Sequence, residues 1–208
     1  MKDKTQHCVA CKRVFDLLLS IPVLILVSPV IIVVTLLVRM RLGSPVFFSQ
    51  LRPGLHARPF YMLKFRTMTN TRGSDGRLLL DDKRMTRLGN FLRRTSIDEL
   101  PEFVNVFKGD MSLVGPRPLL MQYLDRYMPE QARRHEVKPG ITGWAQIHGR
   151  NALTWEEKFK LDVWYVDNWS LWLDIKIIAM TIWKILQREG ISQPGQATME
   201  EFKGIGKP

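Results

Sequence analysis

Thr95-Ser96-Ile97-Asp98-Glu99-Leu100-Pro101-Glu102 is the stretch on which the fold and the site of this chain depend. Two adjacent carboxylates, Asp98 and Glu99, stand here at a predicted helix start. Ser96 and Glu99 have the spacing of a capping box, in which both side chains bond to backbone N–H groups of the first turn. Pro101 is tolerated only near the first turn, so we expect a helix over residues 97–107. Taken alone, the two carboxylates are explained better by capping than by a functional site.

The sequence just before this stretch is strongly basic. Residues 41–95 hold 12 Lys or Arg and 3 acids, in a chain with a net charge of +11. Such an excess suits nucleic acid, anionic lipid or a phosphorylated substrate, and a solvated basic face is the bland alternative. Nucleic-acid modules usually interleave such charge with base-stacking aromatics or carry a reading helix, and neither pattern is evident here, so we expect no nucleic-acid partner.

Several cations are candidates for binding phosphate. Arg93 lies directly upstream of the carboxylates, and Lys64 lies in a predicted strand. Arg117 stands between Pro116 and Pro118, which stiffen the backbone on both sides of it. A guanidinium held in this way suits bidentate capture of phosphate oxygens. The alternative is a rigid surface loop.

The N-terminal part is a membrane segment by composition. Residues 17–38 form a run of 22 residues without charge, which as a straight helix spans roughly 33 Å, enough to cross a bilayer core. Pro29 follows Ser28 in the middle of the run, and basic residues flank both ends. A proline there predicts a break, and the flanking charges favour both ends on the cytosolic side. The alternatives are a spanning helix and a re-entrant hairpin broken at Ser28-Pro29.

The sequence predicts three regions: a tail and membrane segment over 1–41, one globular domain over 42–190, and a polar, loosely ordered tail over 191–208. A mixed α/β (α+β) fold with short strands follows from the apolar runs, which end at glycine and proline. The expected strands are 46–50, 60–68, a short strand within 109–115 and one through Ile147. The expected helices are 85–94, 97–107, 119–134 with a break at Pro129, 155–168 and 171–188, closed by Gly190.

The last two predicted helices and the residues between them carry five tryptophans interspersed with lysines. Amphipathic helices of this kind suit a membrane interface, although a core stripe with a solvated face has the same pattern. Cys8 and Cys11 form a lone C-x-x-C without further ligands at metal-binding spacing. We interpret them as reduced thiols near the membrane.

The motifs together closely resemble those of the monotopic bacterial sugar transferases, the small polyprenyl-phosphate phosphoglycosyl transferases, and most of all their PglC branch. The resemblance covers nearly the whole chain. The matching pieces, in the family's order, are Ser28-Pro29, Arg52-Pro53-Gly54, 64–68, 96–101, 109–118 and 138–144.

This resemblance implies a small catalytic domain with interfacial helices, a re-entrant membrane helix-break-helix, and a place on the cytosolic face of the bacterial inner membrane. Asp98 matches the nucleophile that attacks the β-phosphorus of a UDP-sugar, expels UMP and forms an aspartyl-phosphosugar. Undecaprenyl phosphate then accepts the sugar phosphate, Mg²⁺ bridges Asp98 and the diphosphate, and Glu99 is the second acid. Arg150 and Asp174 match supporting positions.

The PglC branch favours a UDP-linked N-acetylated amino sugar such as UDP-diNAc-bacillosamine, in the first step of protein glycosylation. UDP-glucose or UDP-galactose, for capsule or exopolysaccharide, is the alternative, and downstream glycosyltransferases are possible partners. A transferase that moves sugar without phosphate is weakened because the chain has no Asp-x-Asp motif. A membrane-tethered binding protein without activity is the rival from another class.

Overall fold

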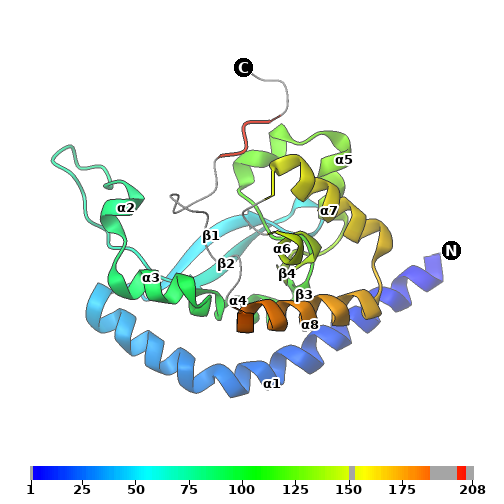
Figure 1. Ribbon diagram of the computed structural model, residues 1–208, viewed down its shortest axis with the longest axis horizontal. Coiled ribbons are helices and arrows are strands. Elements are labelled where there is room, and N and C mark those ends of the chain that lie inside the picture. Colours follow the sequence, from blue (N-terminus) through cyan, green and yellow to red (C-terminus); the bar gives the residue numbers. More distant parts are fainter. Residues whose placement is uncertain (1, 150–152, 188–200, 205–208) are drawn as a thin grey trace.

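A bowed N-terminal helix, α1, runs along one side of the molecule, and the other elements lie above it (Figure 1). The computed structural model describes residues 2–149, 153–187 and 201–204. The body combines several helices with two small sheets. This mixed architecture confirms the predicted mixture of helices and short strands.

The membrane segment is one helix, Lys2–Leu42, so the predicted break at Ser28-Pro29 is corrected to a bow. Pro29 has no N–H to donate to the carbonyl of Ile25, one turn earlier. The Ser28 hydroxyl donates to that carbonyl instead, at 2.8 Å. The helix therefore continues through the proline and bends, as helices commonly do at this residue.

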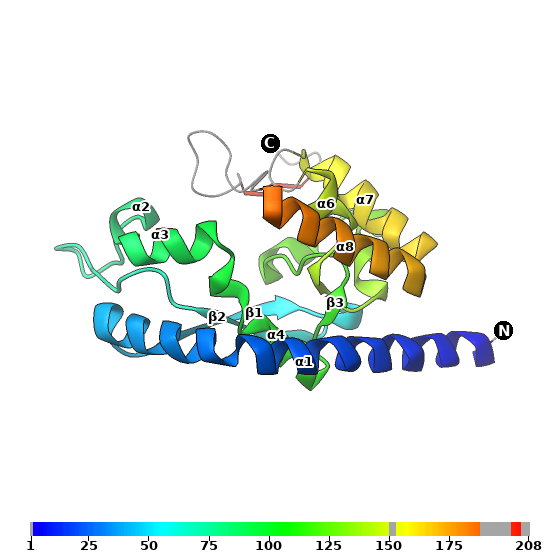
Figure 2. The same ribbon diagram turned by 60° about the horizontal axis from the view of Figure 1, so that its bottom comes forward.

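The arm of α1 before Ser28 and the arm after Pro29 both contact the body of the molecule. In the first arm, the Arg13 guanidinium donates to the carbonyls of Val106 and Phe107, at 2.6 and 2.7 Å. These carbonyls lie at the C-terminal end of α4 (Glu102–Lys108), where a cation also complements the helix dipole. Figure 2 shows α4 lying directly against α1.

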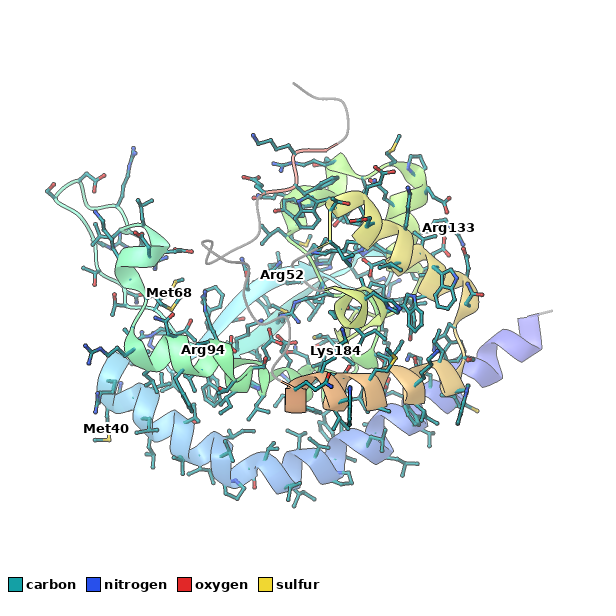
Figure 3. The ribbon with its side chains drawn as sticks, viewed as in Figure 1. Met40, Arg52, Met68, Arg94, Arg133 and Lys184 are labelled. Atoms are coloured by element: carbon teal, nitrogen blue, oxygen red, sulfur yellow. The ribbon has the colours of Figure 1, made fainter. Side chains whose placement is uncertain are left out.

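The second arm of α1 packs through its apolar side chains. Val34 and Val38 form a buried cluster with Phe65 and Leu92. The middle of α1, by contrast, exposes large aliphatic side chains to the outside, as Figure 3 shows along its outer edge. By length and composition α1 can cross a membrane, with a mean hydropathy of 3.0 over its most apolar part.

Two small sheets stand at the centre. Strands β1 (Phe47–Pro53) and β2 (Pro59–Phe65) form an antiparallel hairpin, around a short 3-10 turn at Leu55–Ala57. Strand β3 (Ser112–Val114) pairs in parallel with β4 (Gly140–Thr142). The hairpin and β3 lie where the sequence predicts strands.

The helical segments follow the predictions less evenly. Helices α2 (Asp81–Arg84), α3 (Arg87–Arg94), α7 (Trp155–Asn168) and α8 (Leu171–Gln187) are observed. The helix expected over 119–134 is instead three short pieces, Met121–Arg126, α5 (Pro129–Ala132) and Arg133–Glu136. The strand expected through Ile147 is helix α6 (Trp144–His148). Gly190 lies outside the described residues.

The main hydrophobic core lies between the hairpin, α4, β3 and the helices α6 to α8. A separate aromatic cluster brings Phe202, near the end of the chain, among Tyr123, Tyr127, Trp155 and Phe159. Phe202 is buried. The described part of the tail, residues 201–204, is therefore anchored through an aromatic side chain, unlike the loose tail that the sequence predicts.

Candidate active site

Asp98 and Glu99 lie in a 3-10 turn, Ile97–Glu99, rather than in an α-helix. Ser96, before the turn, has a left-handed backbone with φ 56°, and its side chain caps nothing. The N–H of Leu100 bonds to the carbonyl of Ile97 at 3.2 Å. Pro101 has no N–H with which to extend α4 backwards, so α4 begins only at Glu102.

The capping interpretation of the two carboxylates is therefore wrong. Glu99 bonds to two side chains instead of backbone N–H groups: Lys64 donates to it at 2.7 Å, and the Arg117 guanidinium donates to both of its oxygens. Burial alone would raise the pKa of Glu99, but Arg117 and Lys64 hold it well below its usual range. Glu99 is thus an ionised partner of two cations at neutral pH.

Asp98 differs from Glu99 both in its hydrogen bonds and in the direction of its pKa shift. Its residue is only 7% exposed, and no described residue donates a hydrogen bond to its carboxylate. Burial, and then the neighbouring charge of Glu99, raise the pKa of Asp98 to about 6, while Lys64, Arg93 and Arg117 act in the opposite direction. A carboxylate that is ionised at neutral pH and has no hydrogen-bond donor keeps its lone pairs available for an electrophile.

The cations around Asp98 come from separate elements. Lys64 belongs to β2, Arg93 to the end of α3, and Arg117 to the loop after β3. The Nε of Arg93 donates to the hydroxyl of Thr67 at 3.1 Å, which fixes its side chain. The structure therefore gathers Lys64, Arg93, Asp98, Glu99 and Arg117, all predicted from the sequence, at one place.

Glu102 is a further acid that the sequence analysis did not single out. It is fully buried, and Lys64 approaches its Oε1 at 3.1 Å without hydrogen-bond geometry. Among the described residues neither of its oxygens has a hydrogen-bond partner. Burial, and then Glu99, raise its pKa to about 7. Glu102 stands three residues after Glu99, and residues at this spacing lie on the same side of a helical turn. This spacing is the sequence feature that could have predicted Glu102 beside Glu99.

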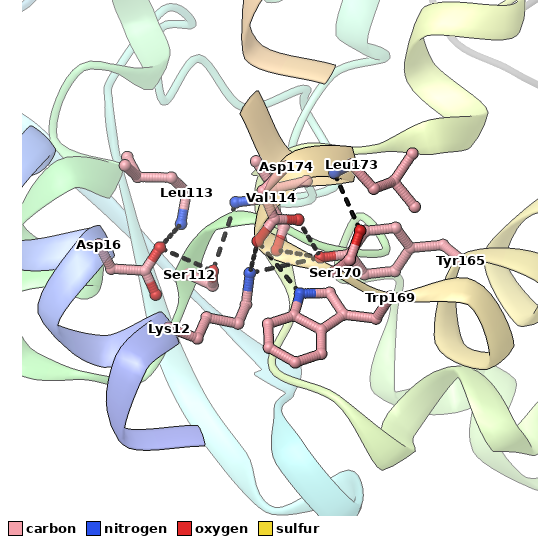
Figure 4. A network of polar contacts seen from close by, with 10 residues as sticks. All are labelled: Lys12, Asp16, Ser112, Leu113, Val114, Tyr165, Trp169, Ser170, Leu173 and Asp174. Atoms are coloured by element: carbon pink, nitrogen blue, oxygen red, sulfur yellow. Dashed lines mark hydrogen bonds and ion pairs between the residues drawn. The ribbon is translucent and has the colours of Figure 1, made fainter. Parts of the chain in front are cut away.

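Other predicted residues lie outside this cluster. Pro118 lies in the loop of Arg117, and its carbonyl faces Arg52 at 3.5 Å. Arg150 is outside the described residues. Asp174 is buried elsewhere and accepts from Lys12 at 2.6 Å and from the Tyr165 hydroxyl at 2.7 Å (Figure 4).

The network in Figure 4 links the first arm of α1 to β3 and to α8. Asp16 accepts from the Ser112 hydroxyl at 2.9 Å and from the backbone N–H of Leu113 at 3.0 Å. Asp16 thereby joins α1 to the strand that leads into the loop of Arg117, and Lys12 joins α1 to Asp174 on α8. Asp174 is a structural partner of this helix, and its hydrogen bonds run to Lys12, Tyr165 and Trp169 rather than to the carboxylate pair.

Asp98 also fits Mg²⁺ as an oxygen ligand. Mg²⁺ typically uses one or two carboxylates together with substrate phosphates and water. The described residues contain no group of three or more acids, histidines or cysteines arranged to hold a metal by themselves. Asp98, which has no hydrogen-bond donor among the described residues, is suited to bind Mg²⁺ together with substrate phosphates and water. Glu99 is less suited, because two cations already neutralise it.

Comparison with known proteins extends this picture. Residues 7–188 match the model of the family described as bacterial sugar transferase. The chain is 60% identical to "Uncharacterized sugar transferase EpsL" of Bacillus subtilis (strain 168), over 94% of this chain and 96% of that protein. It is 42% identical to the UDP-glucose:undecaprenyl-phosphate glucose-1-phosphate transferase of Escherichia coli (strain K12), over 83% of this chain.

A third relative is the undecaprenyl-phosphate galactose phosphotransferase of Salmonella typhimurium, with 39% identity over 86% of this chain. The matches cover 39% of the Escherichia coli protein and 41% of the Salmonella protein, so this chain spans about two fifths of their length. Because the family model covers most of the chain and a relative matches along nearly its full length, this chain belongs to the bacterial sugar transferase family.

Proposed function

We propose that this protein transfers a sugar 1-phosphate from a UDP-sugar to undecaprenyl phosphate, releasing UMP. The observation that carries the proposal is the state of Asp98: a largely buried carboxylate without a hydrogen-bond donor among the described residues, surrounded by Lys64, Arg93 and Arg117. The names of the Escherichia coli and Salmonella relatives, which are sugar-phosphate transferases acting on undecaprenyl phosphate, support the same reaction class.

In the proposed first step, an oxygen of Asp98 attacks the β-phosphorus of the UDP-sugar. The bond from that phosphorus to the bridging oxygen breaks, and UMP leaves with the electron pair. In the second step, a phosphate oxygen of undecaprenyl phosphate attacks the same phosphorus, and the carboxylate of Asp98 is released. No base is needed, because both nucleophiles are ionised near neutral pH.

The surrounding cations stabilise the charge that develops on the phosphate oxygens. Phosphoryl transfer gains its rate mainly from positioning and charge neutralisation. In this proposal Arg117 and Arg93 bind the phosphate oxygens, and Lys64 helps to keep Glu99 ionised beside them. Glu99 in turn holds Arg117 in place. Mg²⁺, if bound at Asp98, supplies further neutralisation of the diphosphate.

The donor sugar we favour differs from the one expected from the sequence. Relatives named for glucose or galactose occur in Escherichia coli, Salmonella typhimurium and Komagataeibacter xylinus, and they are 39 to 44% identical to this chain. These names give no support to the PglC branch in particular. We therefore propose UDP-glucose or UDP-galactose as the donor and undecaprenyl phosphate as the acceptor.

We also propose that the protein sits on one leaflet, at the cytosolic face of the bacterial inner membrane. Both arms of α1 contact the same body, through Arg13 in the first arm and Val38 in the second. A helix held at both ends by one domain favours a re-entrant path over a crossing. Exposed Trp172 and Trp183 on α8 are suited to the adjoining interface.

The function is tested with purified protein, undecaprenyl phosphate and a panel of UDP-sugars. UDP-glucose, UDP-galactose and a UDP-linked N-acetylated amino sugar are compared, and the released nucleotide is identified by chromatography. We expect UMP, with the highest rate for glucose or galactose. Release of UDP would mean transfer of sugar without phosphate, and absence of any nucleotide release across the panel would support a binding protein.

A further inference from the structure

The loop that presents Arg117 has few backbone donors of its own. Pro116 and Pro118 have no N–H, so at these positions the loop can be held only through its carbonyl oxygens. The carbonyl of Pro116 accepts from the N–H of Gly140 at 3.1 Å. The carbonyl of Arg117 accepts from the guanidinium of Arg134 at 2.8 Å. A backbone bond on one side and a charged side chain on the other therefore fix the base of Arg117.

Arg134 is itself held rigidly. Its Nε and one terminal nitrogen donate to Oδ2 of Asp162, on α7, at 3.0 and 2.8 Å. The two side chains are 1% and 2% exposed. The guanidinium also lies 5.6 Å from the ring centre of Phe159 and bonds to the hydroxyl of Tyr127 at 3.3 Å. Arg134 thus has little freedom to leave the carbonyl of Arg117.

A gain in folding stability alone does not explain why Arg134 and Asp162 are buried together as an ion pair. Burying two charges costs hydration that their attraction only partly restores, so a buried ion pair adds little net stability compared with apolar packing. The Arg134–Asp162 pair differs from a purely structural ion pair because Arg134 also contacts the backbone of Arg117. The same terminal nitrogen of Arg134 that bonds to Asp162 also bonds to the backbone of Arg117.

We propose that Arg134, oriented by Asp162, is a positioning residue for Arg117. It fixes the backbone from which the Arg117 guanidinium reaches Glu99, next to Asp98. The proposal rests on the proposed function, in which Arg117 binds the transferring phosphate. Arg134 does not touch the substrate; it acts only through the placement of Arg117.

The first test is Arg134→Lys in the full-length protein. Lysine keeps the charge and can pair with Asp162, but one ammonium cannot reproduce the fork that reaches both Asp162 and the carbonyl of Arg117. We expect the rate of UMP release to fall about 10- to 100-fold, the effect of a small misplacement in an active site. The KM for the UDP-sugar should change by less than about threefold, because the loss lies in the transition state.

A double-mutant cycle separates positioning from general damage. In an Arg117→Ala background, Arg134→Lys should cause no further loss in single-turnover UMP release, because the residue that it positions is gone. If the two losses multiply, Arg134 acts independently of Arg117 and the proposal is overturned. Asp162→Asn provides a second variant that retains an acceptor oxygen, and it should show the same dependence on Arg117.

Arg133→Lys is the matched control. Arg133 precedes Arg134 and pairs with Asp167, on the same helix as Asp162, but it lies at the outer surface (Figure 3). We expect this variant to retain wild-type kinetics. Equal activity of the Arg133 and Arg134 variants would refute the positioning role. A wild-type protein that releases no UMP would instead refute the proposed function.

Discussion

At the scale of single residues, Lys64 lies between two carboxylates with opposite properties. It bonds to Glu99, which remains ionised, and it approaches Glu102, which is buried without a hydrogen-bond partner among the described residues. Lysine carries a single positive charge, and Arg117 already satisfies Glu99 from the other side. When Glu102 is ionised, its buried negative charge is therefore not fully neutralised, and this destabilises the folded protein.

This arrangement predicts a pH-dependent effect of Glu102→Gln. The pKa of Glu102 is raised from the usual 4.5 to about 7, so between these values the folded protein binds a proton that the unfolded chain does not. The free energy of unfolding therefore falls as pH rises through this range, and the cost is fully present above pH 7. Glutamine removes that cost, and we expect the variant to be more stable than wild type by on the order of 3 kcal/mol at pH 8.

Denaturant unfolding in detergent micelles at several pH values measures this difference. It should disappear near pH 4, where Glu102 is protonated in both states. Glu130→Gln is the control, since Glu130 is exposed and its one ion-pair partner in the described part of the chain is Arg133 at the surface. A Glu102→Gln protein that is less stable than wild type at pH 8 would show that Lys64 fully compensates the buried charge.

At the scale of elements, α1 is attached to the body of the molecule through both of its arms. Arg13 binds the end of α4, and the ion pair between Lys12 and the buried Asp174 joins the same arm to α8. The far arm reaches the end of β2, because Arg66, the residue after this strand, donates to the carbonyl of Leu42 at the end of α1. Because both arms contact one domain, we expect the two ends of α1 to lie on the same side of the membrane.

Thiol accessibility checks this expectation. The native Cys11 is exposed in the first arm, and Ser49→Cys places a thiol beyond the second arm. Each is tested separately, the first in a Cys8→Ser background and the second with both native cysteines replaced. Both should react with a membrane-impermeant maleimide in inverted vesicles and neither in intact cells. Labelling from opposite sides would demonstrate that α1 crosses the bilayer.

The elements that the sequence predicts best are those with long or strongly patterned apolar faces. The β1–β2 hairpin, α7 and α8 lie where the periodicity places them. The prediction of a strand through Ile147 fails because short apolar runs fit either period. The helix expected over 97–107 is observed only from Glu102 onward, as α4. Its expected first turn is a 3-10 turn instead, because Ser96 has a left-handed backbone and Pro101 has no N–H.

At the scale of the whole molecule, the tryptophans divide between two roles. Trp155 packs in the aromatic cluster around Phe202, and Trp164 stacks on Trp144. Trp172 is 75% exposed on α8 and Trp183 is 61% exposed. The amphipathic pattern in the sequence thus covers both a core and an exposed apolar face, and periodicity alone does not separate them.

The candidate site was predictable where side chains with distinctive chemistry occur in compact motifs. Asp98, Glu99 and Arg117 were identified in this way. Arg134 and Asp162 were not, because their roles arise from contacts between residues 28 positions apart and a backbone carbonyl that any residue could supply. Such partners become visible only when the fold brings α7 beside the loop of Arg117.

The central claim, that Asp98 becomes covalently linked to the sugar phosphate, is tested most directly by mass spectrometry of the protein after incubation with the UDP-sugar donor and no acceptor. We predict a sugar-phosphate adduct on the peptide that contains Asp98, formed together with an equal amount of UMP and removed by undecaprenyl phosphate. Asp98→Asn should form no adduct. An adduct that persists in Asp98→Asn, or that maps to another residue, would contradict the account.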